Sequence, residues 1–437
     1  MANCTQTSLV FPPVKRRRLE AQFSGGTMTS DAGVHLLRLI DRRLGLLQQV
    51  DQVIPDSRDP RYIQHSQLSL LRQRVYGLCL GYEDLNDHEH LRQDRAIQSA
   101  LDRDQVLGSD STLCRWENRA DRQTAVAVHE VIVNQFIASY EQAPKELILD
   151  FDATDDRVHG DQEGRFFHGY YDHYCFLPLY VFCQDQLLVS YLRSSRIDGA
   201  KHAWAILSLL VKRFRQVWPK VRIVFRGDSG FCRWRMLRWC DRHDVGYIVG
   251  LAKNKRLNRQ IANLLQLAEQ TVQSGQDKVR EFTEFNYRAG SWDQGRRVIA
   301  KIEVNQKGSN PRYICTNLPG EPQWLYDSQY CARSNMENHI KQQQLDLFAD
   351  RTSCHKWWAN QFRLLLSSLS YILMESIRRI GLKGTALARA YVGSLRLKLL
   401  KVAAVVVENT RRIRLLLSSH YPYQRLFELI CARLYPG

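Results

Sequence analysis

The chain has 437 residues, 44% of them hydrophobic and 24% charged, which is the balance of an ordinary folded soluble protein. That length allows two or three domains and at least one large core. The 62 Lys and Arg residues outnumber the 45 Asp and Glu residues, giving a net charge of +17. Such an excess favours a polyanionic partner, nucleic acid first and an acidic membrane surface second.

The sequence argues against a secreted or membrane-spanning protein. Its 11 cysteines are scattered without a C-x-x-C pair or zinc-like spacing, which is typical of reduced intracellular thiols. Residues 1–13 lack the apolar core of a signal peptide. The longest apolar stretches, 364–374 and 399–407, are shorter than the roughly 20 residues that span a bilayer. We therefore expect a soluble cytoplasmic protein.

Residues 1–140 are predicted to be mostly helical. Hydrophobic spacing and capping residues indicate helices over 32–47 and 66–80. A third, short helix over 113–119 carries Arg115 and Arg119 and is preceded by the capping residues 109–112. A capped short helix with two arginines suits a reader of the DNA major groove, and the same pattern also fits an ordinary surface helix.

From residue 141 the pattern changes to strands that alternate with helices. An apolar run over 147–151 predicts a buried strand, and the β-rich runs 176–183 and 186–193 predict a hairpin. A helix over 201–218, a strand over 221–225, a helix over 233–243 and a strand over 245–251 follow. This order predicts a mixed sheet flanked by helices.

The rest of the chain divides into three parts. Residues 255–325 contain one helix and then three strand-like runs, which we interpret as a small β-rich insertion. Residues 329–348 are predicted to return to helix. Residues 351–437 are predicted to be helical and carry 15 Lys and Arg against 3 Glu, a net +12. Most of the excess charge of the chain therefore lies near its C-terminal end.

Acidic residues follow two of the predicted core strands. Asp152 ends the first strand, among Asp150, Asp155 and Asp156, and Asp228 follows the strand over 221–225. The carboxyl ends of neighbouring strands in an α/β sheet meet at the edge where ligands bind, so the two aspartates could share a Mg²⁺ ion, which prefers carboxylate oxygens. The simpler interpretation is a solvated acidic loop.

A third acidic ligand is expected from a helix beside that edge. Arg333, Glu337 and Lys341 are spaced four residues apart and so lie on one helical face. For an isolated helix this spacing would indicate a ladder of surface salt bridges. Together with Asp152 and Asp228 it predicts instead a site built from three carboxylates.

These residues resemble known motifs. Asp-x-Thr at 152–154, Gly-Asp-Ser-Gly at 227–230 and Tyr-x2-Arg-x3-Glu at 330–337 are similar to the three motifs of DDE-type insertion-sequence transposases. The resemblance is closest to the insertion sequence thirteen-eighty group, whose strings are similar to Asp-Ala-Thr-Asp-Asp at 152–156 and to Phe-Phe-x-Gly-Tyr-Tyr-Asp at 166–172. It covers most of the chain. Asp150 is the rival for the first acidic position, and the match to Asp-x-Thr favours Asp152.

The resemblance implies an α/β fold with a ribonuclease H-like, mixed-sheet catalytic core over 141–350 and a β-rich insertion at about 255–325. A helical DNA-binding region (1–140) and a basic helical region (351–437) would flank this core. The implied activity is cut-and-paste transposition: binding of terminal inverted repeats, then metal-dependent strand cleavage and strand transfer. Asp152, Asp228 and Glu337 would hold two Mg²⁺ ions, which Mn²⁺ could replace.

The same resemblance suggests residues that contact DNA. The related pattern continues with a lysine seven residues after its glutamate, but Gln344 holds that position here and the nearest lysine, Lys341, comes early. In related hairpin-forming enzymes an aromatic residue of the insertion holds an extruded base, a role open to Trp292 or Trp324, which are otherwise packing residues. The expected DNA-binding residues are Tyr330, Arg333, Lys341, Arg115, Arg119, Arg411 and Arg412.

Two alternatives remain open from the sequence: another nuclease on the same core, and a DNA-binding relative without catalysis. The basic C-terminal region and the insertion favour the transposase over a simple nuclease, and the three acidic positions favour an enzyme. The partner is expected to be double-stranded DNA, as element ends and target. Because one chain offers one acidic triad, we expect a free monomer, or a weakly associating protein, that dimerises on two DNA ends.

Overall fold

The computed structural model describes residues 8–435. They form two compact units. The first comprises the chain up to residue 51, residues 56–116 and the chain from residue 373, and the second comprises residues 52–55 and 117–372. The first unit thus joins segments from both ends of the chain. Of the helices in residues 8–435, none is long and apolar enough to cross a membrane.

The helices predicted for the N-terminal part of the first unit are confirmed. The apolar run over 32–47 forms α1 (Val34–Leu44) and α2 (Leu46–Val53), divided at Gly45, whose φ of 63° is the left-handed conformation that ends a helix. At the start of α3 (Gln67–Leu80), the Ser66 side chain accepts a hydrogen bond from the Ser69 amide. The other helical segments of this unit are η1 (Pro60–Tyr62), α4 (His88–Leu91), α5 (Arg95–Ala100), α6 (Asp110–Glu117), η6 (Ile377–Gly381), α15 (Val392–Leu395), η7 (Arg396–Leu400) and α16 (Gln424–Leu434).

The first unit also contains strands where helix was predicted. Strands β1 (Leu9–Val14) and β2 (Arg17–Ala21) form a hairpin, and its turn carries the basic residues at 15–16. Strands β16 (Ala404–Asn409) and β17 (Arg412–Leu417) form a second hairpin, on which β3 (Met28–Thr29) pairs. The prediction of an all-helical C-terminal region was therefore wrong, because the consecutive valines of β16 favour a strand and Asn409 supplies a turn.

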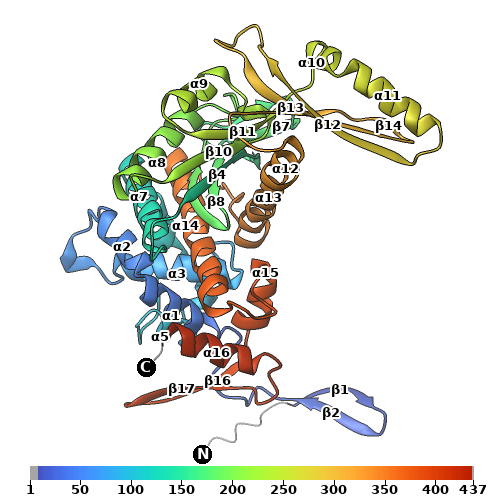
Figure 1. The fold of residues 1–437 in the computed structure, drawn as a ribbon. Coiled ribbons are helices and arrows are strands. Elements are labelled where there is room, and N and C mark those ends of the chain that lie inside the picture. Colours follow the sequence, from blue (N-terminus) through green and yellow to red (C-terminus); the bar gives the residue numbers. More distant parts are fainter. Residues whose placement is uncertain (1–7, 436–437) are drawn as a thin grey trace, which may run out of the picture. The chain divides into compact units, whose positions relative to one another are not determined.

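A nine-stranded mixed sheet forms the centre of the second unit, as predicted (Figure 1). Strand β4 is parallel to β10, which is parallel to β11, and β4 is antiparallel to β8, which pairs with β9. Bounds are β4 (Glu146–Ala153), β8 (Leu179–Cys183), β9 (Gln186–Tyr191), β10 (Arg222–Gly227), β11 (Gly246–Leu251), β12 (Lys278–Tyr287), β13 (Arg296–Asn305), β14 (Gly308–Ser309) and β15 (Arg312–Thr316).

The strands predicted as a β-rich insertion extend this sheet. Strand β15 pairs antiparallel with β11, followed by β13 and β12. An uncovered β11 would present a row of unpaired backbone groups, and β15 satisfies them. The helices α10 (Lys255–Gln260) and α11 (Ala262–Gln273) precede these strands in the chain, and α11 packs against β12 and β13.

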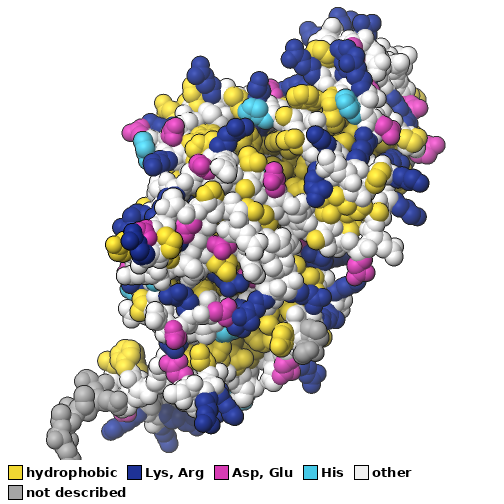
Figure 2. Space-filling model, turned by 90° about the vertical axis from the view of Figure 1, so that its left-hand side faces the viewer, with side chains coloured by type: hydrophobic (Ala, Val, Ile, Leu, Met, Phe, Trp, Pro, Cys, Tyr) yellow, Lys and Arg dark blue, Asp and Glu magenta, His cyan; other side chains and the backbone are white. Residues whose placement is uncertain are grey.

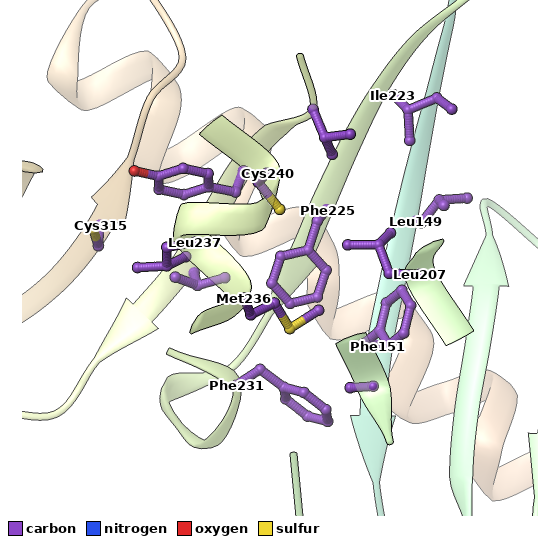
Figure 3. Close-up of a cluster of buried hydrophobic side chains, with 14 of the residues drawn as sticks. Leu149, Phe151, Leu207, Ile223, Phe225, Phe231, Met236, Leu237, Cys240 and Cys315 are labelled. Atoms are coloured by element: carbon purple, nitrogen blue, oxygen red, sulfur yellow. The ribbon is translucent and has the colours of Figure 1, made fainter. Parts of the chain in front are cut away.

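Alternation along the central strands separates two faces. Leu149 and Phe151 of β4 and Phe225 of β10 point into a core shared with the helices α8 (Ala203–Val217) and α9 (Trp234–Arg242) (Figure 3). The intervening residues face the other side, where Val224 and Ile248 pack with Leu325 and Tyr326. Two further long helices are α7 (Arg122–Ala138) and α14 (Trp357–Ser376).

One nearly continuous helical stretch crosses that second face. It comprises α12 (Pro322–Trp324), the π-helical turn η3 (Leu325–Tyr330), the 3-10 turn η4 (Cys331–Arg333), α13 (Ser334–Lys341) and the π-helical turn η5 (Gln342–Asp346). The helix predicted over 329–348 is part of it. Single π-helical turns within a helix are often found at functional sites.

A small three-stranded sheet follows β4 in the chain. Its order is β5 (Asp156–Arg157), β7 (His173–Phe176), β6 (Phe166–His168). The strand predicted over 176–183 is consequently divided into β7 and β8, because Pro178 between them cannot donate a ladder hydrogen bond. The predicted hairpin that follows is confirmed as β8 and β9.

Candidate active site

Two aspartates lie side by side at the carboxyl ends of β4 and β10. The parallel register pairs Asp150 with Arg226 and Phe151 with Gly227, so the next residues in each strand are Asp152 and Asp228. The Asp228 carboxylate is oriented by the Gly230 amide, which donates to its Oδ1 atom at 2.8 Å in the turn η2 (Ser229–Phe231). The adjacency expected from the sequence is therefore present.

Glu337 is linked to these aspartates through an arginine. The Arg333 guanidinium lies 3.0 Å from Asp152 Oδ2 through Nη1 and 3.1 Å from Glu337 Oε1 through Nη2. This confirms that Arg333 and Glu337 share one helical face. Lys341, one turn further along, is exposed. The helical stretch above the sheet thus brings a basic and an acidic side chain to the strand ends.

The carboxylates influence one another electrostatically. Burial raises the pKa of Asp152 to about 6; Arg333 opposes that shift, while the nearby carboxylates of Asp228 and Glu337 add to it. For Arg333, burial acts to lower the pKa, but Asp152, Tyr330 and the other two carboxylates produce a net increase. The three carboxylates therefore repel one another, and the positive charge of Arg333 reduces this repulsion.

Tyr330 packs closely against the Asp228 turn. A Cβ atom at Gly250 of β11 would lie 2.6 Å from the Tyr330 hydroxyl and 2.8 Å from the Ser229 backbone nitrogen. Only glycine leaves room for both groups, which makes Gly250 part of the site although the sequence analysis did not identify it. Burial raises the pKa of Tyr330, with a smaller contribution from Asp228, so the phenol stays protonated at neutral pH.

Asp150, the rival for the first acidic position, has another partner. Its carboxylate is buried and bound in bidentate fashion by Arg226, with Nη2 at 2.7 Å from Oδ2. Arg226 also donates to the backbone carbonyl of Gln329, which fixes the helical stretch above the sheet. Asp150 is therefore held in an internal ion pair, whereas Asp152 lies at the strand end beside Asp228.

Gln344 explains the departure from the lysine pattern. Its side-chain amide donates to the Asp155 carbonyl oxygen at 3.0 Å and to Asp156 Oδ1 at 2.9 Å. Asp156 is fully buried, and burial raises its pKa well above the usual range. A neutral amide satisfies this buried carboxyl group without adding a buried charge, so the structure gives this position an internal contact.

The remaining predicted residues lie elsewhere in the chain. Helix α6 ends at Glu117. Arg115 lies within this helix and is exposed, and Arg119 lies in the turn that follows it. Arg411 and Arg412 are exposed at the turn between β16 and β17. The backbone amides of both arginines donate to the Asn409 side-chain oxygen. Trp292 is only 5% exposed and packs against Tyr287, whereas Trp324 is 50% exposed.

The donor chemistry of the site fits a hard divalent cation, because Asp152, Asp228 and Glu337 offer only carboxylate oxygens. In residues 8–435 no three His, Cys, Asp or Glu side chains are close enough to hold such an ion as they stand. Arg333 supplies the positive charge between Asp152 and Glu337 in this arrangement. Three acids with an arginine at a sheet edge suit chemistry on phosphate groups.

The family described as transposase DDE domain group 1 matches residues 11–436, and the chain belongs to that family. A cryo-EM structure of the piggyBac transposase synaptic complex with hairpin DNA is similar at a TM-score of 0.42 and 11% identity, covering 85% of this chain and 80% of that chain. No curated protein matches the sequence.

Proposed function

We propose that the chain is the transposase of an insertion sequence related to the thirteen-eighty group, which binds terminal inverted repeats and cuts and joins DNA strands. The observation that carries this proposal is the adjacency of Asp152 and Asp228 at two strand ends, with Arg333 pairing both Asp152 and Glu337, in a chain that belongs to a DDE transposase family. Nuclease activity without transposition would use the same carboxylates, and a non-catalytic DNA-binding protein would not need them.

The strand arrangement supports a ribonuclease H-like core. Strands β9, β8 and β4 form an antiparallel meander, and β10 and β11 follow in parallel on the other side of β4. This is the strand order that the resemblance implies for the catalytic domain over 141–350. The proposed insertion over 255–325 then corresponds to the segment that adds β12, β13 and β15 to the edge.

In the proposed mechanism Asp152, Asp228 and Glu337 would hold two Mg²⁺ ions, which Mn²⁺ could replace. Metal ions bound to these carboxylates would supply activation of the attacking oxygen and stabilisation of the leaving oxygen of the phosphodiester. Arg333 pairs with Asp152 and Glu337 in this structure. Bound metal ions would take over the neutralisation of these carboxylates, and Arg333 would then bind a DNA phosphate. The Tyr330 hydroxyl lies close to Gly250, as the Asp228 turn does, and exposed Lys341 would offer a further phosphate contact.

We assign DNA contacts outside the carboxylate edge to the regions 1–140 and 351–437, through Arg115, Arg119, Arg411 and Arg412. Figure 2 shows more Lys and Arg than Asp and Glu side chains on the face that it draws. The net charge of +17 supports a large contribution from phosphate contacts, which bind tightly without reading sequence.

Reversing the charge of the β16–β17 turn should weaken DNA binding in a salt-dependent way. The logarithm of the DNA affinity decreases with the logarithm of the salt concentration. In the double variant Arg411→Glu, Arg412→Glu we expect this dependence to become shallower, with the magnitude of the slope smaller by about 2, one unit for each lost phosphate contact. Fluorescence anisotropy over a salt series measures the slope. Both side chains are exposed, so folding should be unaffected, and Arg411→Gln with Arg412→Gln is the milder matched variant. An unchanged slope would remove both arginines from the interface.

A cleavage assay tests the proposed function itself. The full chain is incubated with duplex DNA carrying the flanking ends of its own gene, with Mg²⁺ or with EDTA. We expect strand cleavage at the element ends that requires the metal ion and joining of those ends to a target duplex. Cleavage without joining would favour a nuclease, and binding without cleavage would favour a non-catalytic relative.

The proposed reaction also predicts an assembly step. Cutting two ends requires two active sites, and each chain offers one acidic triad. The positive charge of free protomers opposes close approach, and two bound DNA ends would neutralise it. Light scattering should therefore find a mainly monomeric free protein and a dimer with two end duplexes bound. A stable dimer without DNA, at micromolar concentration and moderate salt, would contradict this prediction.

A further inference from the structure

Two cysteine side chains meet beside the turn that carries Asp228. Cys232 follows the turn η2 directly, and Cys315 lies on β15. The side chains of Cys232 and Cys315 are hydrogen-bonded to each other. Paired thiols differ from a single cysteine because they can supply both sulfur atoms of one disulfide bond.

The fold of the sheet edge explains why the two residues meet. Strand β15 pairs with β11 so that Cys315 lies opposite Val249, the residue before Gly250. A Cβ atom at Gly250 would lie only 2.8 Å from the Ser229 nitrogen, so η2 passes over the end of β11. The Cys232 amide closes the turn by donating to the Ser229 carbonyl oxygen at 3.3 Å. The Cys232 side chain packs against the hydrophobic cluster that contains Cys315 (Figure 3).

The two thiols differ in access and in proton affinity. Cys232 is half-buried, whereas Cys315 is fully buried. The hydrogen bond to Cys232 and burial both raise the pKa of the Cys315 thiol, so Cys315 keeps its proton at neutral pH. A small oxidant therefore reaches Cys232 first, and Cys315 is placed to react with the oxidised sulfur.

A bond between these sulfurs would move the turn rather than the strand. Cys315 is held within the sheet, because β15 is paired on both sides, with β11 and with β13. A disulfide bond is about 2.05 Å long, much shorter than a hydrogen bond between two thiols, so the Cys232 sulfur must approach Cys315. Asp228 begins the same turn, and this movement would change the position of its carboxylate relative to Asp152.

We propose that Cys232 and Cys315 form a reversible disulfide that displaces Asp228 and thereby stops strand cleavage. This inference rests on the proposed function and adds a redox control of the same site. Disulfides are rare in reducing compartments, where those that form are usually transient and redox-sensing. The pair would therefore hold the enzyme inactive only under oxidative conditions.

Hydrogen peroxide is an oxidant of the required class. The Cys232 thiolate attacks one peroxide oxygen, the O–O bond breaks, and the departing hydroxide takes up a proton to become water. The Cys315 sulfur then attacks the sulfenic acid on Cys232. The S–S bond forms, the S–O bond breaks, and the hydroxide leaves as a second water with the Cys315 proton. A small thiol such as glutathione reverses the step by exchange and is itself oxidised to a disulfide.

The test measures the disulfide and the cleavage rate on the same oxidised protein. The full chain is treated with hydrogen peroxide, the remaining thiols are alkylated, and the peptides are analysed by mass spectrometry with and without dithiothreitol. We expect a cross-linked peptide pair containing Cys232 and Cys315 that dithiothreitol releases.

The cleavage rate should follow the disulfide. Oxidised protein should cleave the end duplex with Mg²⁺ roughly a hundredfold more slowly than reduced protein, because a displacement of about 1 Å at a reacting group has an effect of that size. Dithiothreitol should restore the rate. Affinity for the duplex in EDTA should stay within about twofold, since it depends mainly on phosphate contacts.

Three variants separate this pair from the other cysteines. Cys232→Ser and Cys315→Val should cleave like the wild type when reduced and should keep that rate in peroxide. Cys331→Ser is the matched control, because Cys331 is exposed, lies in η4 with Arg333 and is the rival site of oxidation. This control should stay as sensitive to peroxide as the wild type. Thermal unfolding verifies that each variant folds.

The inference is overturned if peroxide that oxidises Cys331 leaves Cys232 and Cys315 unlinked, or if the cross-linked protein cleaves as fast as the reduced protein. It is also overturned if peroxide inhibits Cys232→Ser as it inhibits the wild type. Each of these results leaves the proposed function intact, since reduced wild-type protein still cleaves element ends with Mg²⁺. Reduced protein that does not cleave would defeat the proposed function and the switch with it, even if the disulfide forms.

Discussion

Each of the variants Asp152→Asn, Asp228→Asn and Glu337→Gln should reduce the rate of strand cleavage by roughly a thousandfold or more. Each removes one carboxylate and with it several kcal/mol of metal-dependent transition-state stabilisation. Affinity for the end duplex should change little, since most of it comes from basic residues that contact phosphates. Single-turnover cleavage with Mg²⁺ and anisotropy in EDTA measure the two quantities on the same preparations.

A matched control for these amides is Asp327→Asn. Asp327 lies in the same helical stretch, on η3, and its carboxylate is paired with Arg280, with Nη1 at 3.1 Å from Oδ2. This variant should cleave within about twofold of wild type, because partly exposed ion pairs contribute little. If Asp152→Asn still nicked element ends while Asp150→Asn did not, the first acidic position would belong to Asp150.

The sequence was sufficient for the acidic edge because local patterns determine it. Apolar runs that end in Asp152 and Asp228 predict strands, and neighbouring parallel strands end at one edge. The spacing of Arg333 and Glu337 predicts a shared helical face, and their ion pair confirms it. What the pattern does not contain is the rotamer of Arg333, which pairs this residue with Asp152, 181 positions away in the chain, as well as with Glu337.

Long-range pairing explains most of what the sequence analysis missed. Whether β12, β13 and β15 form their own sheet or extend the central one depends on which edge is free, and no local signal gives that. Gly250 is a similar case, because its need for a hydrogen side chain comes from Tyr330, which is distant in sequence. The hairpin β16–β17 was detectable in principle, since β-branched residues and Asn409 mark a strand and a turn.

The aromatic string at 166–172 shows a different limit. In the sequence this string, Phe-Phe-x-Gly-Tyr-Tyr-Asp, carries a family resemblance but no signal that says whether its rings are buried. The structure leaves Phe166, Phe167 and Tyr170 exposed on a sheet of three short strands. Sequence alone cannot separate these cases, because burial depends on whether another element covers the sheet.

The buried pair of Asp150 and Arg226 should be the most sensitive point for stability among the ion pairs of the two central strands. Their side chains are only 5% and 8% exposed. Arg226→Met would leave the Asp150 carboxylate buried without its partner, and we expect a loss of about 3–5 kcal/mol in the free energy of unfolding. Urea unfolding followed by tryptophan fluorescence and by circular dichroism measures the loss and shows whether the transition is two-state.

The same two strands provide the control. Arg222 and Glu146 occupy an equivalent cross-strand position and lie 2.9 Å apart, but their side chains are 53% and 34% exposed. Arg222→Met should therefore cost no more than about 1 kcal/mol. The double variant Asp150→Leu, Arg226→Met should regain most of the stability lost in Arg226→Met, because neither charge then stays buried alone. Equal losses in Arg226→Met and Arg222→Met would show that burial does not distinguish the two pairs and that the Asp150 carboxylate reaches water once Arg226 is removed.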